Sequence, residues 1–197
     1  MRCLVYLHGF RSSPLSHKAT LLAEYVSNLN DIDIIIPELP EEPAAAIKKI
    51  HQVMKSLQGV DVLLVGSSLG GFYATSIAEH YHCPAVLINP AVRPYELLEE
   101  YTGQNVNMHT GEVFEFKEAY VEQLKEIECK SITNVDSYLV LLQQGDEVLD
   151  YRQAMENYKD SYVNVSTGGS HAFDEFEKVI NDIIMFGFNR ADYLQSV

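Results

Sequence analysis

The chain has 197 residues, of which 47% are hydrophobic, and a formal net charge of −14 at pH 7. This length predicts one domain that is large enough to bury a core. A surface so negative repels phosphate backbones, which argues against nucleic acid as a partner. No apolar stretch approaches the ~20 residues that cross a bilayer, so we expect no membrane span.

The three cysteines, Cys3, Cys83 and Cys129, are scattered along the chain, and no pair has the C-x-x-C spacing. This usage is typical of a reducing compartment and argues against a disulfide scaffold or a zinc site. The N-terminus opens into an apolar strand after a single arginine, unlike a signal peptide. We therefore expect a cytoplasmic protein.

The first half of the chain alternates apolar strands with amphipathic helices. Apolar runs indicate strands at residues 3–7, 32–36, 60–65 and 84–88. Hydrophobic residues three and four apart predict helices between them, at about residues 17–29, 41–57 and 72–80. Strands that are apolar throughout favour a parallel sheet covered by helices on both faces.

The alternation breaks between residues 91 and 135, a stretch that is too long for a simple crossover. Two helix-like pieces, 95–101 and 117–126, flank a loop rich in Gly, Asn and Thr at 102–111. A long excursion above the carboxyl ends of the strands is where a cap or lid would sit; the alternative is an elaborate crossover. The pattern then resumes with a strand at 137–142, a helix at 151–158, a sixth strand at 162–165 and a closing helix at 174–186.

The turn between the third strand and its helix carries the most specific motif. Gly66-Ser67-Ser68-Leu69-Gly70 fits G-x-S-x-G, the nucleophile elbow of α/β-hydrolases, whose serine projects its hydroxyl above the sheet. Glycines flank the apex because strand and helix pass too close for a Cβ. The alternative is a glycine-rich turn without chemistry, unless the chain also supplies an acid, a histidine and an oxyanion donor.

Acid and base candidates follow the fifth and sixth strands, where open α/β sheets place their sites. The order Ser68, Asp146, His171 is the order that the hydrolase fold uses. His171 would take the proton of Ser68, and Asp146 would orient the imidazole and stabilise its cation. Glu147 and Asp150 are rivals for the acid. Asp146 follows the strand and its glycine most closely, whereas Asp150 suits the N-cap of the next helix.

The oxyanion that forms during acyl transfer needs preorganised hydrogen-bond donors. We assign this role to the backbone N–H of Leu69, directly after the nucleophile, and to that of Phe10, in the loop after the first strand. His8 fits better as a residue that pins this loop. Arg11 and Arg93 are the cations expected near the site, as candidate substrate-binding residues. This mechanism needs no metal and no cofactor.

Five segments carry a further signal: His8-Gly9-Phe10-Arg11-Ser12-Ser13-Pro14, Gly66-Ser67-Ser68-Leu69-Gly70-Gly71-Phe72-Tyr73-Ala74, Asn89-Pro90-Ala91-Val92-Arg93-Pro94, Leu141-Leu142-Gln143-Gln144-Gly145-Asp146-Glu147-Val148-Leu149-Asp150-Tyr151-Arg152 and Gly168-Gly169-Ser170-His171-Ala172-Phe173. Together they resemble the YqiA-type esterases, a family of small bacterial α/β-hydrolases, over nearly the whole chain. The resemblance implies a trimmed hydrolase fold that acts on acyl esters or thioesters, with Ser68 as nucleophile, Asp146 as acid and His171 as base.

We therefore predict a single-domain α/β-hydrolase with a mostly parallel sheet of about six strands, helices on both faces and a small cap at about residues 91–135. The predicted activity is hydrolysis of a small acyl ester through an acyl-enzyme on Ser68. Besides a peptidase of the same fold, for which nothing in the sequence marks a peptide groove, two alternatives stay open. One is an acyl-CoA thioesterase, in which Arg11 or Arg93 meets the CoA phosphates, although the negative net charge argues against it. The other is a catalytically silent hydrolase fold that acts as a binding module.

Overall fold

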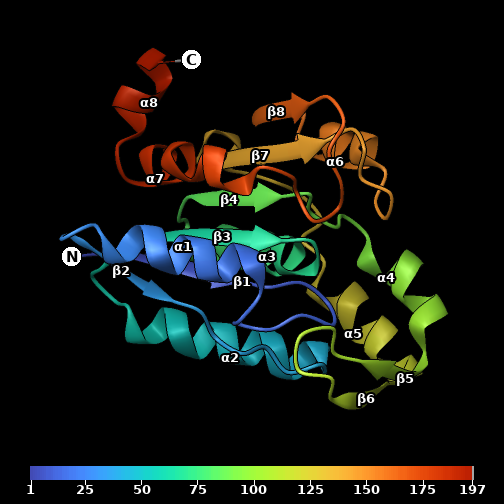
Figure 1. Cartoon of the computed structure of the whole chain (residues 1–197). Helices are drawn as coiled ribbons and strands as arrows, with labels where there is room; N and C mark the ends of the chain where they lie inside the picture. Colours follow the sequence, from blue (N-terminus) through green and yellow to red (C-terminus); the bar gives the residue numbers. More distant parts are fainter. Residues whose placement is uncertain (197) are drawn as a thin grey trace.

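A sheet of six parallel strands runs through the centre of the computed structural model, which describes residues 1–196 (Figure 1). The strand order is β2-β1-β3-β4-β7-β8, and every neighbouring pair is parallel. This arrangement confirms the predicted sheet. The strands are β1 (Arg2–Leu7), β2 (Ile32–Ile35), β3 (Asp61–Ser67), β4 (Ala85–Ile88), β7 (Tyr138–Gln143) and β8 (Tyr162–Ser166).

Helices cover both faces of the sheet because successive side chains of a buried strand point in opposite directions. In β1, Leu4 and Tyr6 pack in one core cluster with side chains of α1 (His17–Ser27) and α7 (Ile180–Phe188). Val5 and Leu7 belong to the opposite cluster. There they join side chains of α2 (Pro43–Ser56), α3 (Leu69–Tyr81) and α6 (Tyr151–Asn157).

The helices begin where the local chemistry favours a start. Pro43 occupies the first turn of α2, where its missing N–H costs no hydrogen bond, and Ala46, Ile50 and Met54 then face the core at intervals of four. Asp150 is the N-cap of α6, as predicted, and its Oδ1 accepts a hydrogen bond from the N–H of Arg152 at 3.1 Å.

Residues 91–135, here called the cap segment, lie at the carboxyl end of the sheet, beside the arrowheads of the strands (Figure 1). Helix α4 (Pro94–Leu98) and the 3-10 turn η1 (Glu99–Tyr101) come first, and α5 (Glu118–Ile127) comes last. Between them, β5 (Gly103–Val106) pairs with β6 (Val113–Phe116) in an antiparallel hairpin. The prediction of a loop at 102–111 is therefore wrong, because Gly103–Val106 form strand β5.

The C-terminal region also differs from the prediction of one closing helix at 174–186. Phe173 and Glu175 have φ values of 65° and 58°, a left-handed conformation that a right-handed helix cannot contain. The helical turns therefore start later, with η3 (Phe176–Val179) and then α7, and a further helix, α8 (Arg190–Ser196), follows. None of the helices in the described part of the chain is long and apolar enough to cross a membrane.

Candidate active site

Ser68 lies at the apex of the turn between β3 and α3, in a strained backbone conformation. Its φ of 55° and ψ of −121° are those of the first central residue of a type II′ turn, a position that glycine dominates. Such a conformation costs a residue with a side chain about 1–3 kcal/mol. Hydrogen bonds fix it: the N–H of Ser68 donates to the carbonyl of Ile88 at 3.1 Å, and its carbonyl accepts from Gly71 at 2.9 Å and Ala91 at 3.1 Å.

Glycines surround the elbow because the chain passes itself at contact distance. A Cβ on Gly66 would lie 2.4 Å from the carbonyl oxygen of Gly70. A Cβ on Gly70 would lie 2.0 Å from the carbonyl oxygen of Leu7 in β1. In the loop after β1, a Cβ on Gly9 would lie 3.2 Å from the Cβ of Ser68. The loop that carries Phe10 therefore passes directly against the nucleophile.

The side chains of Ser68, His171 and Asp146 form a hydrogen-bonded chain. His171 Nε2 lies 3.0 Å from Ser68 Oγ, and its Nδ1 lies 2.9 Å from Asp146 Oδ2. Asp146 Oδ1 accepts from the N–H groups of Val148 at 2.9 Å and Leu149 at 2.8 Å, which orients the carboxylate. Since Asp146 is an acceptor, we assign the imidazole proton to Nδ1, which leaves Nε2 free to accept the hydroxyl proton of Ser68. The structure thus brings together three residues that the sequence places in separate motifs.

The two rival carboxylates have other positions. Glu147 Oε2 accepts a hydrogen bond from the backbone N–H of His171 at 2.9 Å, so Glu147 holds the main chain of the histidine rather than its ring. Asp150 caps α6 and bonds Arg152. Asp146 is therefore the carboxylate that contacts the imidazole, and only 2% of its side chain is exposed.

The residues that hold the loop with His171 were not predicted from the sequence. Asn89 Nδ2 donates to the carbonyl of Ser170 at 3.0 Å, and Gln143 Oε1 accepts from the N–H of Ser170 at 3.0 Å. Lys18 Nζ donates to the carbonyl of Ala172 at 2.7 Å; burial lowers the pKa of this lysine to about 8, against the opposing influence of the Asp146 carboxylate. Asn89 and Gln143 are polar residues at strand ends, which is the one sequence signal that could have found them.

The loop after β1 carries the proposed oxyanion donor Phe10. His8 Nε2 accepts from the N–H of Leu39 at 3.1 Å, and burial lowers the pKa of His8, so the neutral ring pins the loop as predicted. Within the described residues, neither the N–H of Phe10 nor that of Leu69 donates to a protein acceptor. Both groups are therefore available to a ligand.

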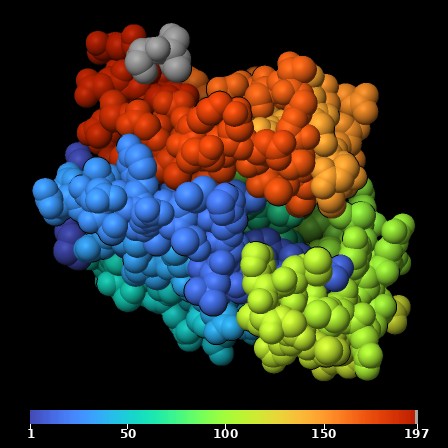
Figure 2. Space-filling model, viewed as in Figure 1, coloured from blue at the N-terminus to red at the C-terminus, as the bar shows by residue number. Residues whose placement is uncertain are grey.

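A cavity of about 340 Å³ lies beside Ser68 and His171, and its lining is mainly apolar. Figure 2 shows a recess where the green cap segment meets the blue N-terminal part and the orange C-terminal part. The cap segment contributes much of the lining through Leu97, Leu98 and Tyr101. The space next to the nucleophile is therefore shaped by residues outside the parallel sheet and its covering helices.

The two candidate substrate-binding arginines lie in different places. Arg11 lines the cavity, and its Nε donates to the carbonyl of Val106 in β5 at 2.9 Å. Arg93 lines a separate surface groove and pairs with Glu96, with 3.3 Å between Nε and Oε1. The structure does not bring Arg93 to the cavity, because it precedes α4 and pairs along the exposed face of that helix.

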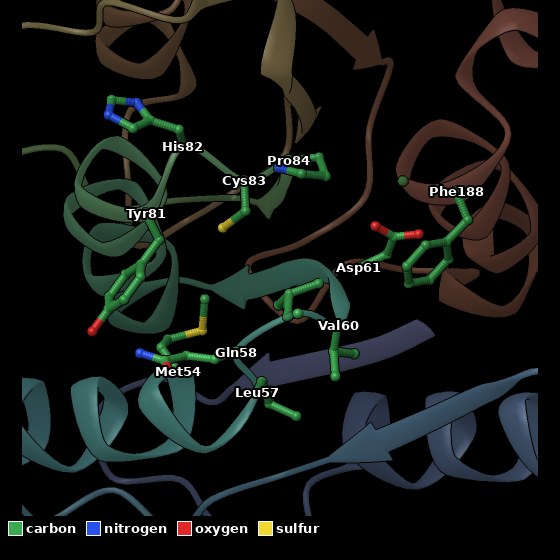
Figure 3. A pocket seen from close by; sticks show the side chains of 13 residues that line it. Met54, Leu57, Gln58, Val60, Asp61, Tyr81, His82, Cys83, Pro84 and Phe188 are labelled. Carbon is green, nitrogen blue, oxygen red and sulfur yellow. The ribbon is translucent and has the colours of Figure 1, made fainter. Parts of the chain in front are cut away.

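A second cavity, of about 450 Å³, lies at the opposite end of the sheet, where β3 and β4 begin (Figure 3). Its lining includes Met54, Tyr81, Cys83 and Phe188. Burial raises the pKa of the Cys83 thiol to about 12, so this thiol stays protonated and is a weak nucleophile. Among residues 1–196, no group of three or more His, Cys, Asp or Glu side chains is placed to hold a metal ion. The hydrogen-bonded chain at Ser68 is therefore the candidate active site.

The family model described as "Uncharacterised protein family (UPF0227)" matches residues 3–188. The chain belongs to the UPF0227 family. The YqiA-type proteins are this family, so the resemblance found in the sequence is confirmed. A UPF0227 protein of Citrobacter koseri is 30% identical over 163 residues, which cover 78% of this chain and 81% of that protein. UPF0227 protein YcfP of Escherichia coli is 28% identical over 168 residues, which cover 81% of this chain and 83% of that protein.

Solved structures with the same architecture are more distant in sequence than these UPF0227 relatives. Est1E from Butyrivibrio proteoclasticus, in a structure with bound ferulic acid, superposes with a TM-score of 0.74 at 15% identity, covering 98% of this chain and 90% of that chain. Alpha/beta hydrolase domain-containing protein 10 from mouse gives a TM-score of 0.74 at 16% identity, with the same coverage of each chain. At such identities the likeness shows the fold, and the chain has the α/β-hydrolase fold.

Proposed function

We propose that this UPF0227 protein is a serine hydrolase that cleaves carboxylic acyl esters through an acyl-enzyme. The observation that carries the proposal is the hydrogen-bonded chain Ser68–His171–Asp146, which lies against an apolar cavity. The serine is strained and exposed to the cavity, the imidazole is oriented, and the acid is buried and fixed. This combination provides a nucleophile, a base and a group that stabilises the protonated base.

In the first half of the reaction, Ser68 Oγ attacks the carbonyl carbon of the ester and its proton passes to His171 Nε2. Asp146 stabilises the imidazolium from the Nδ1 side. The N–H groups of Leu69 and Phe10 hold the oxyanion of the tetrahedral intermediate. When that intermediate collapses, the imidazolium donates its proton to the departing alcohol, and the acyl group stays on Ser68.

In the second half, His171 takes a proton from water as the water oxygen attacks the acyl carbonyl. When the second tetrahedral intermediate collapses, the imidazolium returns that proton to Ser68 Oγ, which releases the carboxylic acid and regenerates the serine. A thioester follows the same path with a thiol as leaving group. The mainly apolar lining favours an uncharged acyl or aryl group next to the nucleophile. Ferulic acid, the ligand of the Est1E structure, is one example of an aromatic acid held by a protein of this fold.

The direct test is hydrolysis of p-nitrophenyl esters from short to long acyl chains by the wild type and by Ser68→Ala. We expect Ser68→Ala to fold and to lose activity by about 10³-fold or more. Asp146→Asn and Glu147→Gln form a matched pair, because both carboxylates lie on the same loop and bond His171. We expect the first to abolish most of the activity and the second to reduce it modestly. Full activity in Ser68→Ala would refute the mechanism.

Acyl-CoA substrates and a fluorophosphonate label separate the proposal from its alternatives. If acyl-CoA is hydrolysed far better than the matched ester, and free CoA inhibits in a manner that salt relieves, the protein is a thioesterase. Arg93 lies outside the cavity, so the structure offers only Arg11 from the pair of predicted phosphate contacts. If no ester or thioester is cleaved and a fluorophosphonate fails to label Ser68, the fold acts as a binding module.

A further inference from the structure

The loop after β1 requires support from outside because its main chain is strained. Arg11 has a φ of 56°, the left-handed region that a long side chain rarely adopts. Residues in such conformations persist where the surrounding structure over-determines them. Phe10, the proposed oxyanion donor, directly precedes Arg11. Whatever holds Arg11 and Ser12 therefore also sets the position of the Phe10 N–H.

The β5–β6 hairpin of the cap segment provides this support through hydrogen bonds in both directions. The N–H of Met108 donates to the carbonyl of Arg11 at 2.8 Å, and Asn107 Nδ2 donates to the carbonyl of Ser12 at 2.9 Å. In return, Arg11 Nε donates to the carbonyl of Val106 at 2.9 Å. The carbonyls of Arg11 and Ser12 are thus bound by one turn, which lies 97 and 95 residues further along the chain from these two residues.

The side chain of Phe10 is fixed by the same segment. Its ring makes edge-to-face contacts with Tyr101, Phe114 and Phe116, at centroid distances of 5.7, 5.8 and 5.2 Å. Such edge-to-face pairs stabilise a contact beyond the area that they bury. The cap segment therefore holds the loop by its main chain at Arg11 and Ser12 and by an aromatic cluster at Phe10.

The side-chain amide of Asn107 links the β5–β6 hairpin to the loop after β1. Asn107 is 9% exposed, and its Nδ2 donates a hydrogen bond to the Ser12 carbonyl. Oδ1 accepts from the N–H groups of His109 at 2.9 Å and Thr110 at 3.1 Å, which closes the turn of the hairpin. One side chain thus shapes the turn and also binds the loop.

We propose that the β5–β6 hairpin is a structural part of the oxyanion hole and that Asn107 is the positioning residue that fixes the Phe10 N–H for the transition state. The proposal rests on the proposed function, in which this N–H holds the oxyanion. A donor that is displaced by a fraction of an ångström loses its interaction with the developing charge, whereas the apolar cavity still binds the substrate. The hairpin therefore acts on kcat and hardly on KM.

The variant Asn107→Asp isolates the contact with the loop. One carboxylate oxygen still accepts from His109 and Thr110, while the other replaces the donor and faces the carbonyl oxygen of Ser12, so the two acceptors repel each other. Asn28→Asp is the control for the change of an amide to a carboxylate. Asn28 follows α1, outside the cap segment, and its Nδ2 donates to the carbonyl of Glu24 at 2.8 Å, so the same substitution there sets a carboxylate against a carbonyl without touching the hairpin.

The experiment measures kcat and KM for a p-nitrophenyl ester, together with hydrogen exchange of the backbone amides in residues 10–12, in the wild type and both variants. We expect Asn107→Asp to lower kcat by about 10–100-fold with KM within about twofold, and to speed the exchange of these amides. We expect Asn28→Asp to stay within about threefold of the wild type in kcat.

Each outcome decides between the proposals. If the wild type hydrolyses the ester and Asn107→Asp matches Asn28→Asp in kcat, the hairpin has no positioning role and the inference is overturned. A loss that appears in KM instead of kcat also overturns it, because it indicates a contact with the substrate in its ground state. If neither the wild type nor Ser68→Ala cleaves any ester or thioester, the proposed function itself fails, and the inference fails with it.

Discussion

The backbone strain at Ser68 can be measured as a change in the free energy of unfolding when its Cβ is removed. Ser68→Gly and Ser68→Ala both remove the hydroxyl and its hydrogen bond to His171, so neither retains the nucleophile. Alanine keeps the Cβ that is unfavourable at φ 55° and ψ −121°, whereas glycine adopts this conformation without a penalty. The difference in unfolding free energy between the two variants therefore reports the backbone strain, offset by the greater freedom of glycine in the unfolded chain.

The expected difference follows from two opposing terms. Relief of strain favours the glycine variant by about 1–3 kcal/mol, and the greater freedom of glycine in the unfolded chain disfavours it by about 0.5–1 kcal/mol. We therefore expect Ser68→Gly to be more stable than Ser68→Ala by about 0.5–2 kcal/mol. For a chain of this length, 1 kcal/mol corresponds to a shift of about 2–4 °C in Tm.

The assay is urea unfolding followed by circular dichroism and tyrosine fluorescence, with equal slopes required for both variants. Ser67 provides the control, because it is buried in β3 with ordinary strand geometry. There we expect the opposite sign, with glycine less stable than alanine by about 0.5–1 kcal/mol. A glycine variant less stable than the alanine variant at position 68, as at position 67, would show that the elbow stores no strain at its apex.

Three further predictions concern the elbow, a half-buried acid and the cavity. Gly70→Ala places a Cβ 2.0 Å from the carbonyl oxygen of Leu7, and we expect it to lower the unfolding free energy by about 3 kcal/mol or more; a Tm equal to that of the wild type would contradict this packing. Burial and the Glu112 carboxylate raise the pKa of Glu41 to about 7, so its stabilising contribution is complete below the unfolded pKa and is lost as the pH rises through 7. In urea unfolding, Glu41→Gln should then be more stable than the wild type by about 1 kcal/mol at about pH 8, and equal to it near pH 4.5, whereas a pH-independent difference would contradict the raised pKa. Leu97→Trp narrows the cavity beside Ser68. The value of kcat/KM should then fall by about tenfold or more for esters with long acyl chains and stay within about twofold for acetyl esters. An equal loss for all esters would show that the acyl chain does not enter this cavity.

The parallel sheet could be predicted because each of its strands is marked by local sequence. Runs such as Cys3 to Leu7 are apolar at every position, and the helices between them place apolar residues at intervals of three and four. The β5–β6 hairpin of the cap segment has no such run of apolar residues. Within β5, Asn105 alone is buried, and the hairpin depends on contacts with Phe10, Arg11 and Ser12, which are remote in sequence.

The candidate site divides in the same way. G-x-S-x-G and the order of the three residues are enough to select the side chains that lie within hydrogen-bonding distance of one another. The position of Glu147, beside the main chain of His171, depends on how two loops meet and leaves no signal in sequence. Arg93 is the opposite case. The sequence predicts this side chain near the site, but in the structure it lines a separate surface groove.

Backbone strain is concentrated at the carboxyl end of the sheet, around the candidate site. Five of the six non-glycine residues with positive φ in the described chain flank the elbow, the loop after β1 or the histidine loop; His82 is the exception. Asn89 shows why such strain persists. At φ 40° its Nδ2 donates to the carbonyl of Ser170, while Oδ1 accepts from the N–H of Gln143 at 3.0 Å. The unfavourable backbone conformation of Asn89 thus places its side-chain amide between β7 and the histidine loop. The regular apolar core of the sheet holds this conformation in place.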